Sequence, residues 1–131
     1  MTDEQLLKEL REATRGLNYM SESDYPVEVF DWGKTEPTPE ALRGLDKNPP
    51  DAPVETSTVE QFFRAPASEP DWKGAEERTV ARRFQALRRL LEANLSDLKV
   101  FRVGTINMPV YVAGRSASGS WLGVSTRVVE T

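Results

Sequence analysis

The sequence predicts an α+β fold with an antiparallel sheet. Helical patterns come early in the chain, with a hydrophobic period of 3.6 residues, and after Leu98 the period changes to two. Short connections separate the later segments, as is typical of strands that pair with their neighbours. The chain has 131 residues, which is enough for one domain with a core of ordinary size, and we expect a single domain over residues 1–131.

The chain opens with an amphipathic pattern that predicts a helix over residues 3–15. Thr2 or Asp3 is suited to cap its start, and Gly16 to close it. The expected buried stripe follows the three-four spacing of one helix face and consists of Leu6, Leu7, Leu10, Ala13 and Leu17. After an acidic turn, Tyr25 to Trp32 has the alternation of a strand.

Residues 33–57 are the least regular part, because five prolines break any long element. Thr38 followed by Pro39 predicts the start of a short helix that runs to Leu45. A second short helix is expected after a cap at Thr56 or Ser57. Its apolar residues would be Val59, Phe62 and Phe63.

The strongest helical pattern covers residues 75–95. Its apolar stripe consists of Val80, Phe84, Leu87, Leu91 and Leu95. The arginine pairs at 82–83 and 88–89 resemble a nucleic-acid-binding feature. Most of these arginines face away from the stripe, so we interpret them as the solvated side of the helix.

Three strands are expected at the end of the chain, over residues 100–105, 110–115 and 121–129. Asn107 and the run 116–119 supply turn residues between them. In the last strand one face is formed by Leu122, Val124, Thr126 and Val128, and the other carries Ser125 and Arg127.

The composition argues against an enzyme. The chain contains no His and no Cys, so the usual neutral-pH base, thiolate nucleophile, disulfide and thiolate metal site are all absent. We therefore expect no catalytic residues. No apolar run is long enough to cross a membrane and the N-terminus lacks a signal-peptide pattern, so a cytoplasmic location is the default expectation.

Charge is distributed unevenly along the chain. Residues 1–72 contain 16 acidic and 7 basic residues, whereas residues 73–131 contain 5 acidic and 10 basic ones, giving net charges of −9 and +5. An acidic half repels the phosphates of a nucleic acid and suits a basic protein surface. Ordinary solubility explains the same charge equally simply.

Three features are candidates for a binding site. Glu22 and Asp24 lie in an acidic turn. Residues of these types are equally typical of a simple turn that connects a helix to a strand. Thr131 ends an unbroken strand, so its carboxylate and hydroxyl offer hard oxygen ligands that suit Mg²⁺, although chain ends are often frayed. Trp72 lies in a proline-bounded loop, either as an interface anchor or packed over the long helix. The Gly-rich run 114–119 lacks the ending of a phosphate loop.

Several segments together resemble the nuclease A inhibitor family of bacteria. They are the acidic turn Met20-Ser21-Glu22-Ser23-Asp24-Tyr25-Pro26 with Glu28-Val29-Phe30, then Asp71-Trp72, Val110-Tyr111-Val112, and the final run from Gly123 to Thr131. Their order and spacing extend over nearly the whole chain. Residues 33–57 match weakly.

The resemblance implies a fold, a partner and site residues. Members are three-layer αβα sandwiches that inhibit a sugar-nonspecific, Mg²⁺-dependent endonuclease of the ββα-metal type, which cuts DNA and RNA. By this resemblance, Thr131 enters the nuclease active site and reaches the catalytic metal. Glu22 adds a negative group there through water, and Trp72 packs as an interface anchor. The metal belongs to the nuclease, so the resemblance implies no cofactor in the free inhibitor. We expect a monomer that binds neither nucleic acid nor membrane directly.

An alternative function is a non-catalytic interaction module of the same fold with an unrelated protein partner. In that case Glu22 and Thr131 would be dispensable for binding. Trp72 or the proline-rich segment would carry the contact instead.

Overall fold

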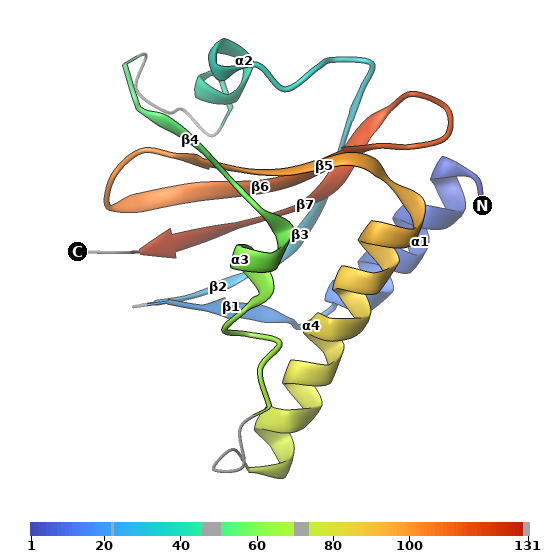
Figure 1. Cartoon of the computed structure of the whole chain (residues 1–131), viewed down its shortest axis with the longest axis vertical. Helices are drawn as coiled ribbons and strands as arrows, with labels where there is room; N and C mark the ends of the chain where they lie inside the picture. The colour runs from blue at the N-terminus through green and yellow to red at the C-terminus, as the bar shows by residue number, and fades with distance from the viewer. Residues whose placement is uncertain (22, 46–50, 70–73, 130–131) are drawn as a thin grey trace.

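The computed structural model describes residues 1–21, 23–45, 51–69 and 74–129 and confirms the α+β class. Four helices accompany two antiparallel sheets in this part of the chain (Figure 1). In chain order the elements are α1 (Asp3–Thr14), β1 (Asn18–Met20), β2 (Asp24–Pro26), β3 (Glu28–Gly33), α2 (Pro39–Arg43), β4 (Val54–Ser57), α3 (Val59–Phe63), α4 (Ala75–Asn94), β5 (Ser96–Val103), β6 (Asn107–Arg115) and β7 (Trp121–Val129).

The main sheet has five strands in the order β3-β7-β6-β5-β4, and every pair is antiparallel. The last strand, β7, is therefore internal. Glu28 pairs with Ser125 on one side of it, and Asn107 pairs with Val129 on the other. The three strands expected at the end of the chain are confirmed, although two begin earlier than predicted. Asn107, expected in a turn, is the first residue of β6.

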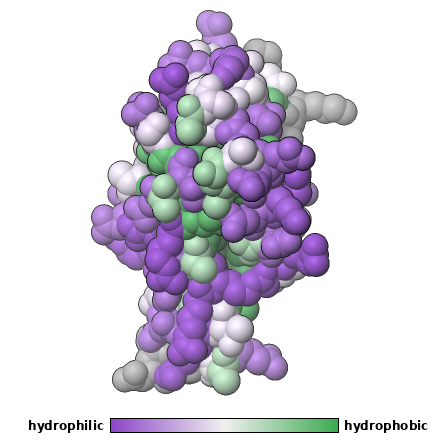
Figure 2. Space-filling model, turned by 90° about the vertical axis from the view of Figure 1, so that its right-hand side faces the viewer, coloured by the Kyte–Doolittle hydropathy of each residue, from purple (hydrophilic) through white to green (hydrophobic). Residues whose placement is uncertain are grey.

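One face of the sheet packs against α1, α3 and α4 (Figure 1). The alternation predicted for β7 is confirmed, because Leu122, Val124 and Val128 all join this core. Its other members include Leu6, Leu10, Leu17, Phe63, Phe84, Leu87, Leu91, Val100, Val110 and Val112. Figure 2 views the molecule from the right-hand side of Figure 1. The surface on this side is mainly hydrophilic, with hydrophobic residues gathered near its middle.

The opposite face of the sheet carries a smaller core beneath α2, a helix of five residues. Leu42 of this helix is fully buried and packs with residues such as Phe101, Val103 and Tyr111. Phe30 and Trp32 stack on this face with ring centroids 4.1 Å apart. Helical residues thus cover both faces, but this second layer is much thinner than the layer formed by α1 and α4.

Capping residues explain where α1, α2 and α3 begin. The Thr2 side chain accepts a hydrogen bond from the Gln5 amide and forms a capping box at α1. Thr38 caps α2 with Pro39 at the first helical position, as expected. At α3 the prediction was wrong by one or two positions. The cap is Thr58, because the preceding residues pair with β5 as strand β4.

Two further predictions were wrong. The strand expected from Tyr25 to Trp32 is split into β2 and β3 at Val27, whose side chain is buried and whose amide bonds to the Leu17 carbonyl at 2.9 Å. Val80 was expected in the buried stripe but is 41% exposed. Figure 1 gives the reason: the N-terminal end of α4 extends past the sheet, so nothing in the sheet covers its first turns.

Among the helices of the described residues, we find none with the length and apolar character needed to cross a membrane.

Candidate functional site

The acidic turn lies at the tip of a two-stranded hairpin that the sequence did not predict. β1 and β2 pair antiparallel, with Met20 opposite Asp24. The Ser21 amide donates to the Ser23 carbonyl at 3.2 Å, and the Ser21 hydroxyl donates to the same oxygen at 3.1 Å. Two donors on one carbonyl make this a tight, locally closed turn. Glu22 itself lies outside the described residues.

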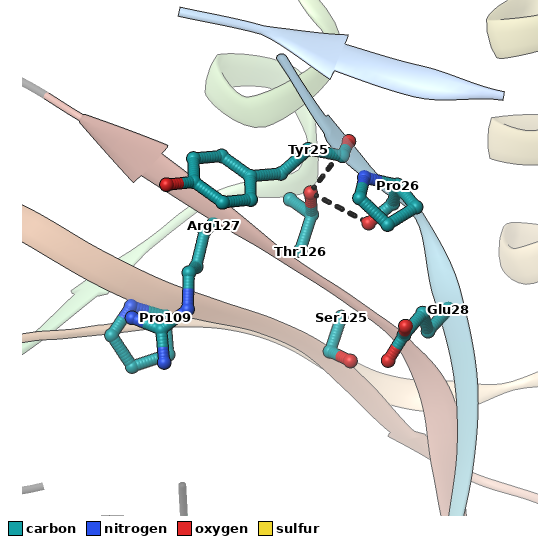
Figure 3. Close-up of a pocket in the computed structure, with 7 residues that line it drawn as sticks. All are labelled: Tyr25, Pro26, Glu28, Pro109, Ser125, Thr126 and Arg127. Atoms are coloured by element: carbon teal, nitrogen blue, oxygen red, sulfur yellow. Dashed lines mark hydrogen bonds between the residues drawn. The ribbon is translucent and has the colours of Figure 1, made fainter. Parts of the chain in front are cut away.

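The hairpin is fastened to the last strand of the sheet. The backbone amide of Val129 donates a hydrogen bond to the Ser21 hydroxyl at 2.9 Å. Nearer the hairpin base, the Thr126 hydroxyl lies 3.1 Å from the Pro26 carbonyl and 3.3 Å from that of Tyr25 (Figure 3). Thr126 is buried, so its hydroxyl bonds are shielded from water.

The structure therefore brings together described residues of the two segments that the sequence singles out, the acidic turn and the final strand. Ser21 and Ser23 flank position 22, and Val129 lies two residues before position 131. Figure 1 shows the hairpin tip and the end of β7 on the same side of the molecule. Thr131 lies outside the described residues, as Glu22 does. The contact between their described neighbours is the observation on which the site rests.

A shallow polar pocket of about 130 Å³ opens beside this contact. Figure 3 shows Tyr25 and Arg127 on one side of it and Glu28 with Ser125 on the other. Arg127 also donates to the Asn107 side chain at 3.2 Å. The lining carries both signs of charge, which suits polar contacts with a protein surface.

The third predicted site residue, Trp72, also lies outside the described residues, but the chain before it is well anchored. The Glu69 carboxylate accepts hydrogen bonds from Arg82 at 2.9 Å and Gln85 at 3.1 Å. The pKa of Glu69 is lowered mainly by the hydrogen bond from Gln85, and the hydrogen bond and positive charge of Arg82 lower it further. Gln85 also donates to the Ala67 carbonyl at 2.8 Å. α4 thus holds the segment that leads toward Trp72.

Three of the four arginines in the pairs on α4 bind groups of the protein itself. Arg83 donates to the carbonyls of Ala13 and Arg15, at 3.0 and 2.7 Å, and so covers the C-terminal end of α1. Arg82 binds Glu69, and Arg88 binds Glu92. These contacts agree with the structural interpretation of the arginines.

The Gly-rich run 114–119 serves as a structural junction. It contains the turn between β6 and β7. In this turn the Ser118 hydroxyl donates a hydrogen bond to the Asp3 carboxylate, and the Ser118 backbone carbonyl accepts one from the Lys34 ammonium group. Hydrogen bonds from Ser118, and then from Ser116, lower the pKa of Asp3. The turn therefore fixes the start of α1.

Sequence reasoning missed the roles of Ser21 and Thr126. Both had a plain local interpretation, as a turn residue and as a strand residue. Their partners lie 108 and about 100 positions away in the chain. Within the described ranges no group of three or more carboxylate, His or Cys side chains is arranged to hold a metal ion.

Comparison with known proteins gives one clear result. The model of the family described as nuclease A inhibitor-like protein matches residues 4–131, which is nearly the whole chain. Comparison with curated proteins gives no match. The chain therefore belongs to the nuclease A inhibitor-like family.

Proposed function

We propose that this protein inhibits a sugar-nonspecific, Mg²⁺-dependent ββα-metal endonuclease by occupying its active site. The observation that carries the proposal is the hydrogen bond from Val129 to Ser21, which holds the acidic turn against the last strand. Family membership supports a nuclease as the partner.

The chemistry follows from what such a nuclease must bind. Its active site holds a phosphate group against a metal ion, so it attracts anionic oxygen ligands. Thr131 offers a carboxylate and a hydroxyl, which are hard donors that Mg²⁺ accepts. Glu22 supplies a second negative group for the same active site. Because neither is a phosphodiester, the nuclease has no bond in them that it is built to cleave.

Two features of the described residues support this arrangement. β7 is paired on both sides, so the strand that leads to Thr131 starts from a rigid support. Preorganised groups lose less conformational entropy on binding, which favours a tight complex. The acidic first half of the chain, at net charge −9, would also speed association with a basic nuclease surface.

The test is a titration of a ββα-metal nonspecific nuclease with Mg²⁺, using the wild-type chain, a chain lacking Thr131, and Glu22→Gln. Stoichiometric inhibition by the wild type, with a loss of about a hundredfold in each variant, is the expected result. Glu12→Gln on the exposed side of α1 is the matched control, because it changes the net charge equally. A chain extended beyond Thr131 should also lose inhibition.

Absence of inhibition by the wild type would contradict the proposal. Equal inhibition by all variants would refute the active-site mechanism and keep the nuclease as partner.

A further inference from the structure

An apolar groove lies between the hairpin and the N-terminal half of α4. Its apolar lining includes the exposed side chains of Met20 and Val80 and the buried side chain of Phe84. The other lining residues are Asn18, Ala65, Pro66 and Glu77. The groove has a volume of about 240 Å³. Its walls come from β1, the segment after α3, and α4, which Figure 1 shows converging below the sheet. We name it the Met20–Val80 groove.

Two of its walls are unusually exposed for apolar residues. Met20 is 74% exposed and Val80 is 41% exposed. Val80 continues the stripe of α4 that is buried at Phe84 and Leu87, so the core-facing side of this helix extends beyond the core. An apolar stripe that runs out into solvent next to another exposed apolar side chain is typical of a surface that binds a partner.

The groove is continuous with the candidate site. Met20 directly precedes Ser21, the residue that binds Val129. At the other end, Glu77 follows Trp72 by five positions in the sequence. The groove therefore begins beside the hairpin segment that the proposed function assigns to the nuclease interface.

The charges around the groove restrict what it accepts. Asp24 is the cross-strand partner of Met20, so both side chains lie on the same face of the hairpin. Asp24 and Glu77 are exposed, and neither forms an ion pair with any residue that the structure describes. An apolar floor flanked by two carboxylates fits an apolar side chain that has lysine or arginine beside it.

We propose that the Met20–Val80 groove is a second contact surface for the nuclease, separate from the metal-directed tip. It receives an apolar side chain of the nuclease whose neighbours are basic. A surface that has evolved to bind nucleic acid is rich in such basic residues. The inference rests on the proposed function, since it names a further part of the same interface.

The experiment measures the dissociation constant of the complex with a ββα-metal nuclease for Met20→Ser and Val80→Ser. Each substitution removes apolar contact without adding charge, and we expect each to weaken binding about tenfold. Met20→Leu and Val80→Ile keep the apolar surface and should bind like the wild type. Ala86→Ser, at an exposed position elsewhere on α4, is the control for adding a hydroxyl group to this helix. Thermal unfolding of each variant checks that the fold is intact.

A second arm tests the charges. Glu77→Gln should slow association and reduce its dependence on salt, whereas Glu12→Gln on α1 should affect association less. If the wild type binds and all the groove variants bind equally well, the groove inference is wrong and the tip mechanism stands. If the wild type does not bind any such nuclease, both proposals fail.

Self-association is the other occupant to examine. Sedimentation of the isolated chain should show a monomer at the concentrations used for binding. A dimer that Val80→Ser dissociates would assign the groove to a second copy of this chain and overturn the inference.

Discussion

The Ser21 hydroxyl accepts a hydrogen bond from the Val129 amide at 2.9 Å, which joins residues 108 positions apart. Within the turn, the same hydroxyl donates to the Ser23 carbonyl at 3.1 Å. One small side chain thus closes the acidic turn and attaches it to the final strand. The geometry of the proposed inhibitory tip depends on it.

Replacing Ser21 by Ala should weaken nuclease inhibition about fivefold, because the turn loses its hydrogen bond to the end of β7, worth about 1 kcal/mol. Ser23→Ala is the control, since Ser23 takes part through its backbone carbonyl. Ser21→Thr keeps the hydroxyl and should restore inhibition. Inhibition constants for the three variants check the prediction. Equal constants for Ser21→Ala and Ser23→Ala would contradict it.

Gly123→Ala should destabilise the fold by about 4 kcal/mol or prevent folding, which is the range of severe core defects. An added Cβ would lie 1.8 Å from the Val112 carbonyl oxygen of the neighbouring strand, and backbone cannot move aside cheaply. Gly114→Ala is the comparison. There the Cβ would approach Leu98 Cδ2 at 2.9 Å, which a side-chain rotation relieves, and Leu95 Cβ at 2.8 Å, which needs a small backbone shift, so we expect a cost of about 1–3 kcal/mol. Urea unfolding of both variants measures the difference.

Arg83→Met should lower the free energy of unfolding by about 1–2 kcal/mol, because two carbonyls at the end of α1 lose a charged donor. Arg82→Met is the matched control on the same helix. Its partner is Glu69 in an exposed ion pair, so the loss should be below about 0.5 kcal/mol. Thermal unfolding distinguishes the two. Similar losses of unfolding free energy in both variants would show that the Arg83 hydrogen bonds stabilise the fold no more than an exposed ion pair does.

Asp3 should make the stability depend on pH. The hydrogen bonds from Ser118 and Ser116 lower its pKa below the ordinary value of 3.8 in the folded chain. The folded state then binds this proton less readily than the unfolded state. The stabilisation is therefore complete above the ordinary pKa and is lost as the pH falls through the lowered one.

Asp3→Asn and Ser118→Ala test this contribution by denaturant unfolding at pH 7 and at pH values below 3.8. Each variant should be less stable than the wild type at neutral pH, and the difference should narrow in acid. A difference that stays constant with pH would mean that the Asp3 carboxylate does not contribute through its charge.

Long periodic segments and the short helices with a cap were predictable from the sequence, and short strands were not. The stripe of α4 and the alternation of β7 follow directly from burial against one sheet face. β1 and β4 have three and four residues, too few for any period to emerge. The pairing of β4 also depends on β5, a partner distant in the chain. The exposure of Val80 was not predictable, because hydrophobic periodicity identifies one face of a helix but not how far the sheet extends beneath that face.

The candidate site was likewise predictable from the sequence in part only. The acidic turn and the last strand stand out from residue types and order. Their contact through Ser21 depends on how the chain folds back, which no local pattern encodes. The pairing of Met20 with Asp24, and therefore the acidic flank of the groove, likewise requires the hairpin register.

The strand order has a consequence for how this protein is made. β3 is complete by Gly33, yet its partner in the sheet is β7, which begins at Trp121. During synthesis the ribosome releases β3 long before the strand that must lie beside it. The edge of β3 therefore waits unpaired while about ninety residues are translated, and such delayed pairing slows folding and leaves a nascent chain open to aggregation. We expect the sheet to assemble only after translation has passed β7, with the internal strand added last.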